Sequence, residues 1–154
     1  MAIQFDYLKG YGPCILEAIA SGVVLSPYEK YDNVKKIYKI TLDLTEEQYT
    51  ALENKAVEIA EHKYSYGYNS CLIGGIADSF SRRLARLLAK ITNAANDNQM
   101  NCSEMGLNLL KAAFPDFLSE DDTAQVTPFR LYMRLIIDIA EGDIKASKIQ
   151  IYKK

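Results

Sequence analysis

The chain has 154 residues, of which 49% are hydrophobic and 25% charged, and its net charge at pH 7 is −2. This length predicts one domain over residues 1–154 that can fold without a metal ion or a disulfide. The three cysteines lack Cys-x-x-Cys spacing and the chain has one histidine. We therefore expect no disulfide framework, no metal site and no cofactor. The slightly acidic charge argues against a nucleic-acid partner.

No basic segment followed by a long apolar run opens the chain. No apolar run reaches the roughly 18 residues that a membrane helix needs. We therefore expect no membrane span. Unpaired cysteines favour a reducing environment, so the predicted location is cytoplasmic. The sequence does not predict an oligomeric state.

Alternating apolar and polar residues predict strands in the first third of the chain. Four segments have this pattern: residues 3–7, 14–18, 23–25 and 34–42. In the fourth, Tyr38, Ile40 and Leu42 share one face, while Lys39 and Thr41 share the other. A further strand is predicted near the C-terminus, over residues 144–152.

Helical periodicity replaces the alternation after residue 44. Thr45 and Gln48 form a predicted capping box, and the helix that they open ends near His62. Pro115 ends a later helix, and Thr127 followed by proline opens another. Four helices result, near residues 46–62, 72–91, 102–114 and 128–142, with loops at 63–69 and 93–101. The predicted fold class is α+β.

Cys102 follows a polar loop and opens an apolar helix. The amide groups and the dipole at a helix start favour an anion, so a thiolate is stabilised there. Glu104 in the same turn has the charge that suits the dipole. The alternative is that Cys102 is a small buried apolar residue. Cys14 is predicted to be a core residue of its strand.

Four segments in this order resemble the circularly permuted papain-like amidases and peptidases of the NlpC superfamily. They are Ile15-Leu16-Glu17-Ala18 with Ser21-Gly22-Val23, Lys63-Tyr64-Ser65-Tyr66-Gly67, Asn101-Cys102-Ser103-Glu104, and Val126-Thr127-Pro128. Cysteine, serine and glutamate at a helix start, with Thr-Pro downstream, are the most specific part. The resemblance covers nearly the whole chain and implies a small antiparallel sheet packed with about four helices.

The resemblance also implies a mechanism of acyl transfer without a cofactor. Cys102 would attack an amide or ester carbonyl and hold the acyl group covalently until water releases it. Tyr64 would help to hold the oxyanion, although a packing role is an open alternative. Glu17 would orient the base, or else be an exposed strand carboxylate. The implied substrates are small peptides, amides or lipid esters.

The base of the resembled family is a histidine at the start of the first strand, which falls at or just before Met1 in this chain. Three interpretations stay open. The native chain begins upstream and carries the histidine there; the domain is an inactive binding or structural module on the same fold; or His62 serves as the base. The last requires His62 to come within hydrogen-bond reach of Cys102.

Overall fold

The computed structural model describes residues 1–68, 98–118 and 126–153. Three N-terminal strands, β1 (Ala2–Leu8), β2 (Gly12–Ile19) and β3 (Gly22–Ser26), form an antiparallel sheet in the order β1-β2-β3. All three occur where alternation predicted them. Glycines with positive φ, such as Gly10 and Gly22, make the turns between them. The predicted helix at 72–91 lies outside the described residues.

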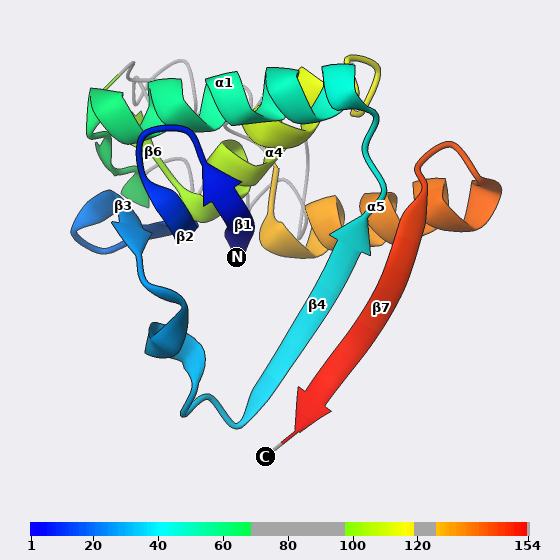
Figure 1. Cartoon of the computed structure of the whole chain (residues 1–154), viewed down its shortest axis with the longest axis horizontal. Coiled ribbons are helices and arrows are strands. Elements are labelled where there is room, and N and C mark those ends of the chain that lie inside the picture. Colours follow the sequence, from blue (N-terminus) through cyan, green and yellow to red (C-terminus); the bar gives the residue numbers. More distant parts are fainter. Residues whose placement is uncertain (69–97, 119–125, 154) are drawn as a thin grey trace.

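The sheet has two differently covered faces. Phe5 lies opposite Cys14 and Ile3 lies opposite Leu16, and this side of the sheet packs on two helices (Figure 1). The other side carries Ile15 and Glu17, since successive strand residues point to opposite faces. The 3-10 turn η1 (Tyr28–Tyr31) covers that side, and it was not predicted.

Among the described elements, two helices cover the inner face of the sheet, and each begins with a capping box. Helix α1 (Glu46–His62) starts after Thr45 as predicted, and α4 (Cys102–Ala113) starts after Asn101. Short strands β5 (Ser65–Tyr66) and β6 (Gln99–Met100) pair in parallel between them. Loops were predicted at both places, because a two-residue strand is too short to show a period.

Helix α4 lies between two hydrophobic cores and contributes to both. Met105, Leu109 and Ala113 join the first core, between the sheet, α1 and α4. Leu107 and Leu110 join the second core, which also contains residues of α5 (Pro128–Glu141). Burying a leucine or methionine fully contributes about 1.5–3 kcal/mol. Helix α4 therefore connects the two cores through the side chains on its opposite sides.

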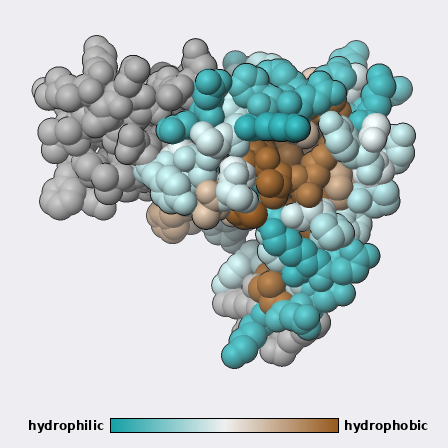
Figure 2. Space-filling view, turned by 90° about the vertical axis from the view of Figure 1, so that its left-hand side faces the viewer, coloured by the Kyte–Doolittle hydropathy of each residue, from teal (hydrophilic) through white to brown (hydrophobic). Residues whose placement is uncertain are grey.

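The remaining strands form a separate ribbon. Strands β4 (Lys36–Leu42) and β7 (Ala146–Lys153) pair in antiparallel fashion and extend away from the body (Figure 1). Figure 2 shows this projection from the side, with a hydrophobic patch on the body above it. The described chain is therefore α+β, as predicted, with α1, α4 and α5 as its described α-helices. None of the helices in the described ranges has the length and apolar character that crossing a membrane requires.

Gly22 lies where β3 closely approaches the segment before β5. Its φ is +116°, and an added Cβ would lie 2.3 Å from the backbone oxygen of Tyr64, which accepts the amide of Val23 at 2.9 Å. Gly22→Ala should therefore lower the free energy of unfolding by about 2–4 kcal/mol. Gly10 has φ +84° but nothing within 4 Å. Gly10→Ala should cost only the backbone strain, about 1–2 kcal/mol. Equal losses in urea unfolding would contradict the close contact.

Candidate functional site

The start of α4 is held by a capping box that is itself buried. The Asn101 side chain, 0% exposed, accepts the amides of Ser103 and Glu104, both at 2.9 Å. The Glu104 carboxylate returns to accept the Asn101 amide at 2.7 Å. Asparagine before the helix and glutamate at its third position are the residues that such a cap needs. The helix therefore starts at Cys102, as predicted.

Cys102 is half-buried at the first helical position, and its side chain packs against the first core. Cys102 as a residue is thus partly exposed, with apolar neighbours on the side of the core. Cys14 differs, because it is buried within β2, and burial raises the pKa of its thiol. The prediction that Cys14 is a core residue is confirmed. Of these two cysteines, Cys102 is the more exposed.

The first residue of the chain lies against the helix that carries Cys102. A Cβ added to Gly106 would lie 1.9 Å from Cε of Met1 and 3.0 Å from its Sδ. Gly106 follows Cys102 by four residues, so both lie on the same side of α4. Met1, which precedes β1, is therefore beside the turn of α4 that follows Cys102. The resemblance assigns a histidine at or just before this residue.

His62 and Tyr64 lie together at the end of α1. Their rings are 4.1 Å apart, and His62 Nε2 lies 3.3 Å from Oδ1 of Asn98. Asn98 precedes Cys102 by four residues, and extended chain of that length spans roughly 13 Å. Within the described ranges, no hydrogen bond joins His62 to Cys102. The structure thus brings His62 to Tyr64 but does not place its imidazole on the thiol.

Tyr64 is half-buried and packs against the first core, while its backbone oxygen accepts the Val23 amide. The strand pairing sets residues 65–66 beside residues 99–100, just ahead of the cap at Asn101. Tyr64 therefore lies in the segment that neighbours the chain leading to Cys102. The contacts of Tyr64 are therefore those of a packing residue, which is the alternative that the sequence left open.

Glu17 is almost completely buried, at 1% exposed, so the alternative of an exposed strand carboxylate is wrong. It accepts hydrogen bonds from Ser26, Lys30 and Tyr31 on the face of the sheet opposite α4. Burial raises the pKa of Glu17, but these three donors outweigh burial and hold that pKa below its ordinary value. Burial and the Glu17 carboxylate raise the pKa of Tyr31 to about 12.

The Glu17 network fastens η1 to the sheet. The donors come from β3 and η1, and Lys30 forms an ion pair with the carboxylate. Sequence analysis did not predict these partners, although all three follow Glu17 within 14 residues. Within the described residues, no hydrogen bond links Glu17 to Cys102, His62 or Tyr64. The contacts therefore support a structural anchor, and the orienting role remains a hypothesis.

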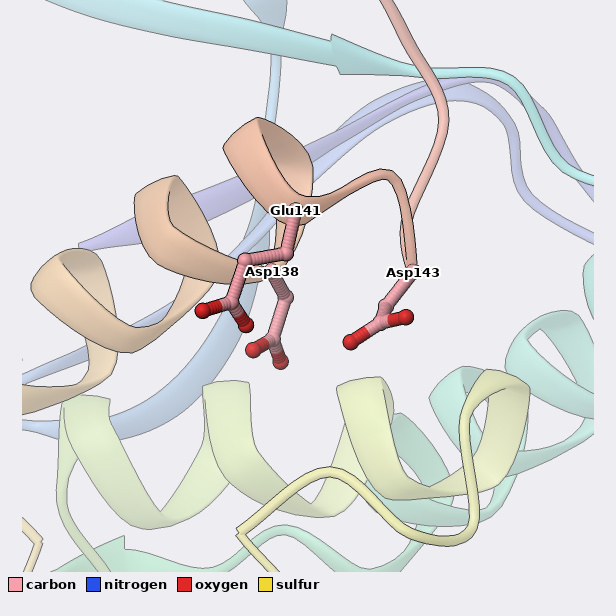
Figure 3. A group of neighbouring side chains, drawn as sticks. All are labelled: Asp138, Glu141 and Asp143. Atoms are coloured by element: carbon pink, nitrogen blue, oxygen red, sulfur yellow. The ribbon is translucent and has the colours of Figure 1, made fainter.

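An acidic group that sequence analysis did not select lies at the end of α5. Carboxylate oxygens of Asp138, Glu141 and Asp143 lie within 4.8 Å of one another, and Figure 3 shows Asp143 pointing back toward the helix. Such oxygens are the ligand type that Ca²⁺ prefers. Nε of Arg134 lies 2.7 Å from Oδ1 of the buried Asp138, an ion pair without hydrogen-bond geometry. This cation balances the one buried carboxylate, so we interpret the group as an ion-paired helix end.

Comparison with known proteins found no match: no family model fits the chain, and neither curated proteins nor solved structures match it significantly.

The Glu17 network predicts a pH-dependent stability. Because the folded-state pKa of Glu17 is lowered, its charge stabilises the fold above its unfolded pKa of about 4.3 and loses this effect as the pH falls below it. Glu17→Gln should therefore lower the free energy of unfolding by about 1–3 kcal/mol at pH 7.

The difference between the wild type and Glu17→Gln should shrink as urea unfolding is repeated below about pH 4. Glu58, whose side chain is 59% exposed and paired with Lys55, gives the control. Glu58→Gln should change stability by less than about 0.5 kcal/mol. A Glu17→Gln effect of that size, or one independent of pH, would show that the network does not stabilise the fold.

Proposed function

We propose that this chain is a cysteine-type acyl hydrolase with a permuted papain-like arrangement, and that Cys102 is its nucleophile. The observation that carries the proposal is the position of Cys102. It is half-buried at the first residue of the middle helix, and the start of β1 lies beside the next turn of that helix at Gly106. A nucleophile at a helix start beside the first strand is the arrangement that the resemblance implies.

The chemistry follows from the thiol. The Cys102 sulfur attacks the carbonyl carbon of an amide or ester, a sulfur–carbon bond forms, and the bond to the leaving amine or alcohol breaks. The thiol proton passes through a base to the leaving group. Water then cleaves the thioester, which releases the acid and restores the thiol. His62 is the imidazole of this chain that could serve as the base, after its ring leaves Asn98.

A specific observation favours a second candidate, a binding module on the same fold. The strand position that faces α4 at Gly106 holds Met1, whose thioether cannot accept a proton from a thiol at neutral pH. Glu17, which would orient a base, is bonded to Lys30, Ser26 and Tyr31. A module of this kind would bind a small peptide, amide or lipid ester without turning it over.

Hydrolysis of an activated ester and of a peptide amide separates the two candidates. If the chain is a hydrolase, Cys102→Ser should abolish turnover and shift the melting temperature by only a few degrees, since the residue is half-buried. Cys14→Ser is the matched control, and any folded fraction of that variant should keep its turnover because Cys14 lies inside the core. Turnover that survives in Cys102→Ser would remove Cys102 from the mechanism.

The same assay tests the base. If His62 takes the proton, His62→Ala should slow turnover by roughly a hundredfold or more. Met1→His, expressed behind an added initiator methionine, places an imidazole beside Gly106 and should raise the turnover that depends on Cys102. Absence of turnover of both substrates, in wild-type form and as Met1→His, would contradict the hydrolase and favour the binding module.

A further inference from the structure

The ribbon formed by β4 and β7 is open on both edges in the described part of the chain. The two strands pair with each other from Lys36 opposite Lys153, at the far end, to Leu42 opposite Ala146, at the base. The ribbon leaves the body at its base, and the C-terminus lies at the far end (Figure 1). A two-stranded ribbon without further cover is marginally stable in water, so this one is expected to gain stability from a partner.

One face of the ribbon is apolar along its length. Tyr38, Ile40 and Leu42 share this face with their register partners, among them Ile149. Leu42 at the base packs against the second core, whereas Tyr38 and Ile149 are 55% and 54% exposed. On the other face, Nζ of Lys39 reaches back to Oε1 of Gln4 in β1. The face that carries Lys39 and Thr41, and at the far end Ile37, is therefore turned toward the sheet, and the opposite, apolar face continues from the second core into solvent.

Charge is separated along the ribbon. At the far end the exposed Lys35 is followed by position Lys36, which is paired with position Lys153. Five exposed acidic residues lie near the base, Asp43, Glu46, Glu47, Glu141 and Asp143, together with two exposed lysines, Lys145 and Lys148, so the base carries a net negative charge. The ribbon thus has a basic end and an acidic base, with the apolar face between them.

We propose that the apolar face of the ribbon binds the same face of a second copy of this chain, with the two ribbons antiparallel about a two-fold axis. In this arrangement the basic end of each ribbon lies over the acidic base of the other, so the surface is complementary to itself. The two apolar faces pack as two sheets do, about 10 Å apart. Nucleic acid or an anionic membrane would suit the far end but would be repelled by the acidic base.

Sedimentation equilibrium of the full chain tests the proposal. At moderate ionic strength the wild type should sediment at twice the 17.3 kDa mass of the chain. Ile149→Glu places a charge on the apolar face and should weaken dimerisation at least about tenfold. Its side chain is half exposed, so the fold should persist, as circular dichroism can verify. Phe129→Glu on α5, at a residue 70% exposed, is the matched control and should leave the dimer intact.

Charge reversal identifies the orientation of the two copies. Lys35→Glu and Asp43→Lys should each weaken the dimer, and the double variant should recover most of the loss because the reversed charges meet again across the axis. Salt of about 1 M, where the Debye length is about 3 Å, should weaken the wild-type dimer without abolishing it. A wild type that is monomeric at every concentration, or a dimer that Ile149→Glu leaves unchanged, would overturn the proposal. So would a double variant weaker than both single variants.

Discussion

The structure depends on the buried capping box at Asn101 and Glu104. A buried carboxylate is costly unless its oxygens are hydrogen-bonded, and Glu104 is 6% exposed. The Glu104 carboxylate accepts the Asn101 amide, and the Asn101 side chain accepts the amides of Ser103 and Glu104. All of these groups are paired when the helix begins at Cys102. A shift of the helix start by one residue would leave several of these polar groups buried without partners. The position of Cys102 follows from this constraint.

Because α4 joins both cores, fixing its start also positions the elements around it. The sheet and α1 pack on one side through Met105 and Leu109, and α5 packs on the other through Leu107. The first strand is brought beside Gly106, where the absence of a side chain leaves room for Met1. The candidate site therefore consists of Cys102, whose position the cap fixes, and a neighbouring strand. The proposed hydrolase and the proposed binding module share this geometry and differ in the proton acceptor.

Most of the described elements could be predicted from the sequence, because their signals are local. The period-2 pattern of β1 to β4 and the caps at Thr45, Asn101 and Thr127 depend on neighbouring residues. The pairing of β4 with β7 could not be predicted, since more than 100 residues separate Leu42 from Ala146. The residues around Glu17 also come from other segments of the chain. The alternating pattern of a strand does not predict which of its faces a neighbouring turn will cover. The Cys102 helix start was predictable, whereas the neighbours of the thiol depend on tertiary packing.

The two capping boxes in the described part of the chain allow a direct test of the central claim that the buried box holds the fold. Thr45 and Asn101 each form the reciprocal pair of a capping box, with Asn101 accepting one further amide, but Thr45 is exposed and Asn101 is 0% exposed. Urea unfolding of Thr45→Ala and Asn101→Ala compares them. The account predicts a loss of about 1 kcal/mol for Thr45→Ala. It predicts about 2–4 kcal/mol for Asn101→Ala, which leaves buried amides without an acceptor. Equal losses would contradict it.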